Sequence, residues 1–213
     1  MSRTRVTQLS ISLDGYATGV PQTLETPFGH AGMRLHTWMF EAEPGGDRVR
    51  EGVDGALAAV GWDGSVGAEI MGRNKFGPQR GPWTDEEWRG WWGEDPPFHT
   101  PVFVLTHHPR PSIMMAGGTT FHFIDATPEN ALAQAREAAG GLDVRIGGGP
   151  STVRQFLAAG LVDEMHVVVV PILLGRGESL WTGLEGLESA FDIETVHSPR
   201  SGVTHLLFER RAR

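Results

Sequence analysis

The sequence predicts one α/β domain, spanning residues 1–213, with a mixed, mostly parallel sheet and a C-terminal antiparallel hairpin. Two observations support this fold class. Short apolar strands alternate with amphipathic helices between residues 101 and 174, as in parallel strands joined by helical crossovers. Residues 191–208 instead contain two strand patterns on either side of a turn, as in a hairpin. We find no linker or internal repeat that would divide the chain, so we expect a single domain.

The N-terminal half alternates short regular elements with long loops. Apolar residues at every second position predict a strand from Val6 to Leu13, which ends at the turn dipeptide Asp14-Gly15. We then expect a loop over 17–46 with one helical turn near 35–40, a helix over 47–60, a strand over 65–71, a turn and brief helix over 72–76, and a tryptophan-rich loop over 77–101. Loops of this length in a compact domain usually carry function.

The C-terminal half has the clearest signals. Capping residues predict one helix that begins at Thr127 and another that begins at Ser151 or Thr152, each stopped by glycine. The apolar run 165–174 predicts a strand buried on both faces, and Pro171 inside it indicates a strand end, a bulge or an edge position. Further strands are expected over 101–105, 119–124, 143–146, 191–196 and 203–208.

The composition excludes several classes of function. The net charge is −8, whereas a nucleic-acid-binding protein needs a basic face to neutralise phosphates. The chain has no cysteine, which excludes disulfides, thiolate catalysis and cysteine-ligated metal, and no histidine spacing typical of a metal site occurs. We find neither a run of about 18 apolar residues nor a signal-peptide pattern. We therefore expect a cytoplasmic protein that binds neither a membrane nor a metal.

A run of three glycines between a strand and a helix is the strongest candidate for a ligand site. Gly147, Gly148 and Gly149 are followed closely by Ser151 and Thr152 at the start of the helix. Glycines let a ligand approach the backbone, and a helix N-terminus offers free N–H groups to an anion such as a pyrophosphate. A purely structural turn is the alternative, but it needs only one or two glycines. The run matches neither a Rossmann fingerprint nor a P-loop.

Two further polar segments directly follow predicted strands. A predicted helix begins at Gly72, Arg73 and Asn74. Its free backbone N–H groups lie beside the cation of Arg73 and the amide of Asn74, which favours phosphate binding. Thr106 and His107 offer a hydroxyl and an imidazole at a strand end, which suits a phosphomonoester. A solvated basic turn and an ordinary polar loop are the respective alternatives.

Other candidates also lie after strands. Asp14 and Tyr16 follow the first strand, and Arg176 stands between two glycines after the long apolar run, where it could bind an anion of the substrate or simply form a turn. Ligands of open α/β sheets bind beyond the carboxyl ends of the strands, so a parallel core would bring all these segments to one edge. Asp14 and Tyr16 are candidate proton donors, and His36 in the long loop is a more distant one.

Taken together, these segments resemble the dihydrofolate reductase superfamily, and most closely the C-terminal reductase domain of the bifunctional deaminase-reductase of riboflavin biosynthesis. The likeness spans nearly the whole chain. It rests on Ser12-Leu13-Asp14-Gly15, Met71-Gly72-Arg73, the glycine run 147–149, Leu161-Val162-Asp163-Glu164 and the segment 171–177. The resemblance implies a three-layer fold with a mixed, mostly parallel sheet, NADPH as the hydride donor and, commonly, a homodimer.

The same resemblance implies a place for the candidate residues around NADPH. They are Gly72, Arg73 and Asn74 at the phosphates, Thr106 and His107 at the 2′-phosphate, residues 147–152 at the pyrophosphate, and Asp14 beside the nicotinamide and the substrate. The chain departs from both relatives, because no deaminase motif with zinc ligands precedes this segment and the acid that dihydrofolate reductase carries on its first long helix has no counterpart. Folate and the riboflavin-pathway substrate are therefore not supported.

The sequence thus predicts an NADPH-dependent reductase that transfers hydride to a C=O or C=N bond of a small heterocyclic molecule. Three alternatives stay open. The protein could bind NADP(H) without turnover, it could have no nucleotide site, or it could be an acyl hydrolase that uses Ser151.

Overall fold

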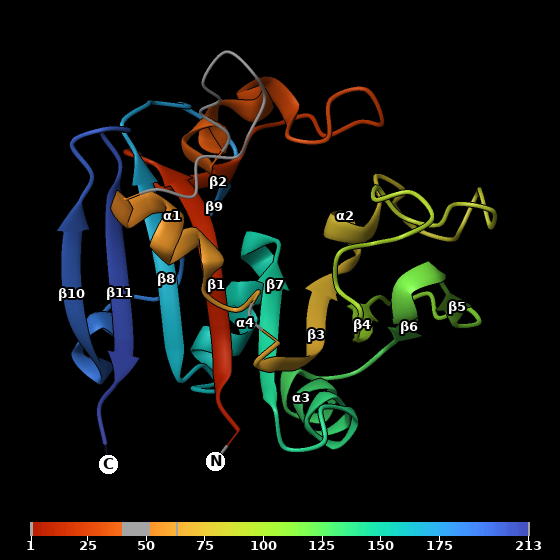
Figure 1. The fold of residues 1–213 in the computed structure, drawn as a ribbon. Coiled ribbons are helices and arrows are strands. Elements are labelled where there is room, and N and C mark those ends of the chain that lie inside the picture. The colour runs from red at the N-terminus through yellow and green to blue at the C-terminus, as the bar shows by residue number, and fades with distance from the viewer. Residues whose placement is uncertain (1, 40–51, 63, 213) are drawn as a thin grey trace.

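The computed structural model describes residues 2–39, 52–62 and 64–212, which form the elements labelled in Figure 1. The strands are β1 (Thr4–Ser12), β2 (Tyr16–Thr18), β3 (Val66–Gly72), β4 (Pro101–Leu105), β5 (Ile113–Met114), β6 (Thr120–Ile124), β7 (Asp143–Gly148), β8 (Glu164–Val170), β9 (Glu178–Ser179), β10 (Phe191–His197) and β11 (Thr204–Arg210). The α-helices are α1 (Gly52–Ala59), α2 (Arg73–Phe76), α3 (Pro128–Ala138) and α4 (Pro150–Ala158). The 3-10 helices are η1 (Gly29–Leu35), η2 (Thr37–Met39), η3 (Ala116–Gly118) and η4 (Leu187–Ala190).

One sheet runs through the described part of the chain, with nine strands in the order β10-β11-β8-β1-β7-β3-β4-β6-β5. The six strands from β8 to β6 are mutually parallel, whereas β11 pairs antiparallel with both β8 and β10. This confirms the predicted mixed, mostly parallel sheet with its C-terminal hairpin. The parallel strands end toward the top of Figure 1, where β2, β9 and α2 lie. Residues at the ends of separate strands therefore meet at this edge.

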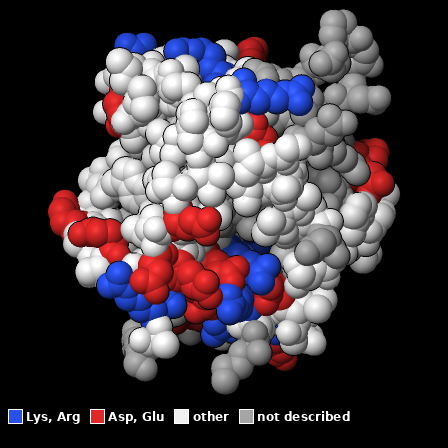
Figure 2. Space-filling model, turned by 60° about the vertical axis from the view of Figure 1, so that its left-hand side comes forward, with Lys and Arg blue, Asp and Glu red and all other residues white. Residues whose placement is uncertain are grey.

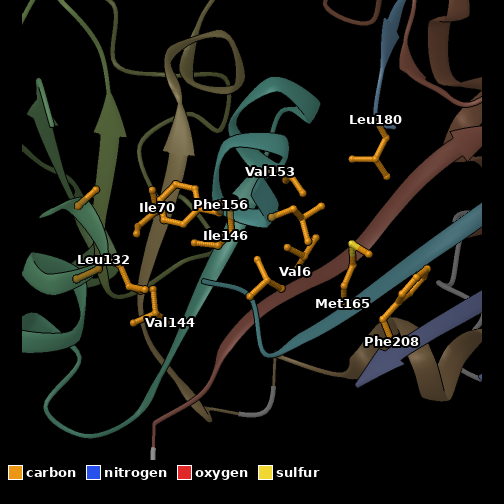
Figure 3. Packing of buried hydrophobic residues seen from close by; sticks show 14 of the residues in the cluster. Val6, Ile70, Leu132, Val144, Ile146, Val153, Phe156, Met165, Leu180 and Phe208 are labelled. Atoms are coloured by element: carbon orange, nitrogen blue, oxygen red, sulfur yellow. The ribbon is translucent and has the colours of Figure 1, made fainter. Parts of the chain in front are cut away.

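Helices cover the sheet on both faces, which gives three layers. The main core packs α3 and α4 against one face, with Phe156 of α4 beside Ile146 of β7 and Leu132 of α3 on the side of Val144 (Figure 3). On the opposite face, η1, η2 and α1 pack against β8, and a tryptophan-rich loop packs against β4 and β6. Between these two covers, β1, β7 and β3 lack an apolar layer, because strand alternation turns Glu69 and Arg145 to this face.

Most element predictions agree with the structure. Thr127 caps α3 by accepting a hydrogen bond from the backbone N–H of Asn130 at 3.3 Å. β8 ends at Val170, directly before Pro171, so the proline marks a strand end. The predicted helix 47–60 is present as α1 over residues 52–59, and residues 40–51 lie outside the described part of the chain. Among the described helices, none is long and apolar enough to cross a membrane.

One prediction is wrong and three short strands were not predicted, each for a physical reason. The expectation that Ser151 or Thr152 caps α4 is wrong, because Gly149 is the N-cap and makes no side-chain hydrogen bond. The fixed φ of Pro150 suits the first helical position, which starts the helix one residue earlier than the hydroxyls could cap it. The strands β2, β5 and β9 were not predicted, because two or three residues show no period.

The surface shown in Figure 2 carries acidic and basic side chains intermixed at its lower end, with a broad uncharged area above them. Some charges pair across strands. Arg5 of β1 lies 3.0 Å from Asp143 of β7, and Arg3 lies 3.3 Å from Glu209 of β11. Arg3 and Glu209 are exposed, and a pair of this kind contributes little stability, whereas Arg5 and Asp143 are partly buried.

Candidate functional site

A cavity of about 940 Å³ lies over β1, β7 and β3, between the two covers of the sheet. This volume is at the upper end of the range for cofactor and small-molecule sites. The cavity collects the predicted segments from separate strand ends: Gly72, Arg73, Asn74, Thr106, His107, Gly147, Gly148, Gly149, Ser151 and Thr152. The topology therefore brings together all the predicted cofactor-binding residues.

The three glycines of the strand-to-helix turn are needed for different reasons. Gly148 has a φ of 108°, which an L side chain rarely adopts, and its peptide bond to Gly149 is cis. A Cβ on Gly147 would lie 1.9 Å from Oε1 of Glu69, so this glycine is required for packing. A Cβ on Gly149 would meet no atom within 4 Å and would enter open space. Gly149 thus leaves a free cradle for a ligand beside the N-terminus of α4.

The turn after β3 packs directly against the start of α4. A Cβ on Gly72 would lie 2.2 Å from the hydroxyl oxygen of Thr152. Thr152 is buried, so its hydroxyl fits against the bare backbone of Gly72 and does not cap the helix. The two glycine turns that the sequence singles out therefore form one continuous surface of the cavity.

Arg73 extends along this surface with part of its hydrogen-bonding capacity unused. Its guanidinium stacks on Trp83 at 3.7 Å and donates to the carbonyl of Gly81 and, at 3.5 Å, to the hydroxyl of Thr106. The Nε and NH2 atoms are buried and have no hydrogen-bond partner among the described residues. Burial, together with the charge of Arg80, lowers the pKa of Arg73. Buried unpaired donors on a cation are costly, so this position favours an anionic ligand.

A buried ion-pair cluster forms the floor of the cavity. Glu69 of β3 is fully buried, and its carboxylate lies 2.9 Å from Nζ of Lys75 and 2.6 Å from Nε of Arg145. Burial alone would raise the pKa of Glu69, but the two cations keep it below its usual value. Arg145 also stacks on Trp62 at 3.9 Å. We did not predict this cluster, although charged residues inside two otherwise apolar strands were its signal.

Thr106 and His107 lie at the end of β4, on the rim of the cavity. The hydroxyl of Thr106 accepts a hydrogen bond from the backbone N–H of His108 at 3.1 Å. Nδ1 of His107 lies 3.1 Å from the carboxylate of Asp125, and its side chain is 92% exposed. Thr106 is thus fixed in place, whereas His107 is free to meet a ligand from solvent.

The residues that line the cavity do not include Asp14, Tyr16 or Arg176. Asp14 instead accepts hydrogen bonds from Ser12 at 2.6 Å and from the backbone N–H groups of Leu174 and Gly175 at 3.1 and 2.6 Å. These hydrogen bonds, chiefly that of Ser12, lower its pKa to about 2. Such a carboxylate is ionised at neutral pH, so the expectation that Asp14 donates a proton is corrected: it holds the loop after β8.

The other two residues also have structural places. Tyr16 begins β2, opposite Ser179 of β9, and its ring packs against the apolar cluster under η1 and η2. Arg176 is exposed in the loop between β8 and β9. The geometry therefore gives no support to Tyr16 as a proton donor or to Arg176 as a substrate ligand.

The lowered pKa of Asp14 predicts a pH-dependent effect on stability. A depressed pKa in the folded state stabilises the protein above the unfolded value, and this contribution is lost as the pH falls toward about 2. We expect Asp14→Asn to be less stable than the native chain near neutral pH, with a difference that shrinks below about pH 4. Urea unfolding at several pH values measures this. A difference that does not change with pH would contradict it.

The rest of the cavity lining comes largely from the segment 17–46, for which the sequence predicts an irregular loop. These lining residues are Thr18, Gln22, Phe28, His36 and Met39, together with Ser10 of β1 and Trp62. Of these, only His36 was named from the sequence, as a distant candidate. Residues 17–39 have no regular period, so no pattern could show which side chains point inward.

Comparison with solved structures shows the same fold. A candidate riboflavin biosynthesis protein from Shewanella sp. PV-4 has a TM-score of 0.62 and 21% identity, with both chains covered completely. A pyrimidine reductase-like protein from Corynebacterium diphtheriae has a TM-score of 0.55 and 16% identity, with 100% of this chain and 93% of that chain covered. These similarities confirm the predicted dihydrofolate reductase-like fold.

A third solved structure is longer than this chain. It is the diaminohydroxyphosphoribosylaminopyrimidine deaminase/5-amino-6-(5-phosphoribosylamino)uracil reductase of Thermotoga maritima, with a TM-score of 0.54 and 13% identity, and the match covers 99% of this chain but 57% of that chain. A search of curated proteins gives no match. The model of the RibD C-terminal domain family matches residues 4–205. The chain therefore belongs to the RibD C-terminal domain family, as its sequence resemblance predicts.

Proposed function

We propose that the protein is an NADPH-dependent reductase that transfers hydride to a C=O or C=N bond of a small heterocyclic substrate. Membership of a reductase-like family supports the reaction class. The observation that carries the cofactor proposal is that Arg73, a cation with two buried guanidinium nitrogens that have no hydrogen-bond partner among the described residues, lines the same cavity as the open cradle at Gly149. A buried cation beside a free helix N-terminus suits the phosphates of a dinucleotide.

The cavity residues fit NADPH in the following way. The backbone at Gly149 and Ser151 would hold the pyrophosphate, Arg73 and Asn74 would pair with its oxygens, and Thr106 with His107 would lie by the 2′-phosphate. When bound, NADPH supplies the hydride. The chain itself contributes a fixed cradle for the phosphates, and the side chains at the other end of the cavity orient the substrate.

Ligand-dependent melting tests the cofactor. At about 100 times its Kd, NADPH is expected to raise the Tm by roughly 5–10 °C, and NADH by less. It should also quench tryptophan fluorescence, since Trp83 stacks on Arg73. Arg73→Met should weaken binding by about tenfold or more, because a charge-assisted hydrogen bond is lost. Arg211→Met is the matched control, because Arg211 pairs with Asp192 at 2.9 Å and does not line the cavity.

Two outcomes would overturn the proposal. If millimolar NADPH gives neither a Tm shift nor quenching, the proposal that NADPH is the cofactor is wrong. Pterins, aminopyrimidines and small carbonyl compounds are then tested as substrates. If NADPH binds but none of them causes its oxidation, a catalytically silent NADP(H)-binding protein is favoured instead. Loss of NADPH absorbance in these assays therefore separates a reductase from a binding protein.

A further inference from the structure

One wall of the cavity is formed by residues 52–62, which comprise α1 and the turn that follows it, and we call this segment the α1 wall. Ala58 and Trp62 of the α1 wall line the cavity. Trp62 stacks on Arg145 of the cavity floor at 3.9 Å, and Nη1 of Arg145 donates to the carbonyl of Gly61 at 3.1 Å. The wall and the floor are therefore in contact, so a displacement of α1 would change the shape of the cavity.

The helix in this wall has little stability of its own. α1 has eight residues, and two of them are Gly52 and Gly55. Isolated helices shorter than about 12 residues are marginal in water, and an interior glycine weakens a helix further. The position of α1 therefore depends on contacts with the rest of the chain, and polar side chains provide such contacts in its first turn and at its C-terminal end.

Gln8 of β1 binds the C-terminal end of α1. Its side-chain nitrogen donates to the carbonyls of Leu57 and Val60, at 3.1 and 2.7 Å. Carbonyls at the end of a helix have no partner within the helix, so this one amide satisfies two of the groups there. Gln8 also lines the cavity, which places it next to both α1 and the ligand space.

The backbone of Gln8 is strained. Its φ of 49° lies in the left-handed region, which glycine adopts freely and glutamine rarely. The pairing of β1 with β8 shifts register between Val6 and Leu9. Thr7 and Gln8 therefore stand opposite the single residue His166, as in a β-bulge, which redirects a side chain. Glycine would remove the strain together with the amide, and strain of this kind beside a cavity indicates a functional constraint.

Asp54 binds the first turn of α1 to the far side of the sheet. Its carboxylate accepts hydrogen bonds from Nε2 of His205 at 2.9 Å and from the hydroxyl of Ser198 at 2.8 Å. Both Asp54 and His205 are buried, and Nδ1 of His205 lies 2.9 Å from Nε2 of His166. A carboxylate can only accept, so with both rings neutral the proton of His205 is on Nε2, and its Nδ1 accepts from His166. This chain of hydrogen bonds connects α1 to β11 and β8.

We propose that Gln8 and Asp54 are positioning residues that set the shape of the ligand cavity through α1, and that the strained backbone of Gln8 is retained because its amide holds this wall. The inference rests on the proposed function, because NADPH is the ligand that reports on the cavity. Neither residue is required to touch a reacting atom. Their effect on binding passes through the α1 wall and Trp62.

Gln8→Asn separates a positioning role from a merely structural one. Asparagine tolerates a left-handed φ and retains an amide, but its side chain is one carbon shorter and cannot reach both carbonyls. We expect NADPH to bind about tenfold more weakly, the equivalent of one lost hydrogen bond. The Tm without ligand should change by only a few degrees, because relief of strain offsets the lost hydrogen bonds. Gln134→Asn is the matched control, since Gln134 is exposed on α3 outside the cavity.

A signal from Trp62 reports on the wall without any ligand. In protein labelled with 5-fluorotryptophan, the ¹⁹F resonance of Trp62 is assigned by its loss in Trp62→Phe. Gln8→Asn and Asp54→Ala should each shift this resonance, whereas Gln134→Asn should not. Because both residues act through α1, the double variant Gln8→Asn/Asp54→Ala should lose less NADPH affinity than the product of the two single losses. If Asp54→Ala does not fold, Gln8→Asn decides alone.

Three results would show that the inference is wrong. They are normal NADPH affinity in Gln8→Asn, weakened affinity with an unchanged Trp62 resonance, and a double variant whose loss equals the product of the single losses. If NADPH does not bind the native protein, the proposed function fails instead. The Trp62 resonance then decides the inference, which is wrong if Gln8→Asn leaves that resonance unchanged.

Discussion

Gly149→Val is expected to weaken NADPH binding by roughly 100-fold while the protein remains folded. Gly149 has φ −70° and ψ −173°, values that a valine can adopt, and its Cβ would meet no protein atom within 4 Å. The added side chain would therefore occupy only the space in which we place the pyrophosphate. Two lost charge-assisted hydrogen bonds, at about 1.5 kcal/mol each, account for the size of the effect.

Titration of tryptophan fluorescence with NADPH measures the loss, and an unchanged Tm without ligand shows that the fold is intact. Gly149→Ala should give a smaller loss, since a methyl group fills less of the cradle. Gly148→Val, the choice that the sequence alone would suggest, is unsuitable because the φ of 108° strains any L side chain. Unchanged NADPH affinity in Gly149→Val would place the cofactor elsewhere.

Removing the carboxylate of Glu69 should have the largest effect on stability. Glu69→Leu is expected to lower the free energy of unfolding by about 3–5 kcal/mol, because it leaves the buried Arg145 and the partly buried Lys75 without their counter-ion. Glu69→Gln should cost less, since the amide oxygen can still accept one hydrogen bond. Since the folded pKa of Glu69 is lowered, the contribution is full above its unfolded pKa and is lost as the pH falls through the folded value.

Urea unfolding measures these differences. In the double variant Glu69→Leu/Arg145→Met, removing the second charge should restore part of the lost stability, and the double-mutant cycle gives the coupling. The exposed pair Arg211–Asp192 serves as the comparison, since breaking it should change stability by less than about 1 kcal/mol. If Glu69→Leu is as stable as the native chain, the carboxylate of Glu69 does not stabilise the fold through Lys75 and Arg145, contrary to what their geometry indicates.

The sequence predicted those features that depend on neighbouring residues. The cap at Thr127 and the glycine turn at 147–149 each follow from a local conformational preference, and the structure has both. For Pro171 the sequence allows a strand end, a bulge or an edge position, and the structure has the strand end. The parallel sheet then brought the strand ends to one edge, as the general rule for α/β folds predicts.

Features that depend on distant partners were not predictable. Glu69 and Arg145 are 76 positions apart, and their pairing requires the register of β3 against β7. Asp14 looks like a functional acid in the sequence, but its partners Leu174 and Gly175 belong to a loop some 160 positions away. Only the folded chain shows that, besides the hydroxyl of Ser12, these two backbone N–H groups lower the pKa of Asp14.

The contact between Gly147 and the Glu69 carboxylate limits how this protein can be made more heat-resistant. Replacing a buried charged cluster with apolar residues of similar volume is often neutral or stabilising. Here the same atoms are the surface on which the glycine turn at 147–149 rests, at a distance that admits no additional carbon. A redesigned apolar floor would therefore shift this turn, and the stability gained would be exchanged for affinity at the proposed NADPH site. Engineers should work on the exposed face of the hairpin and leave this layer untouched.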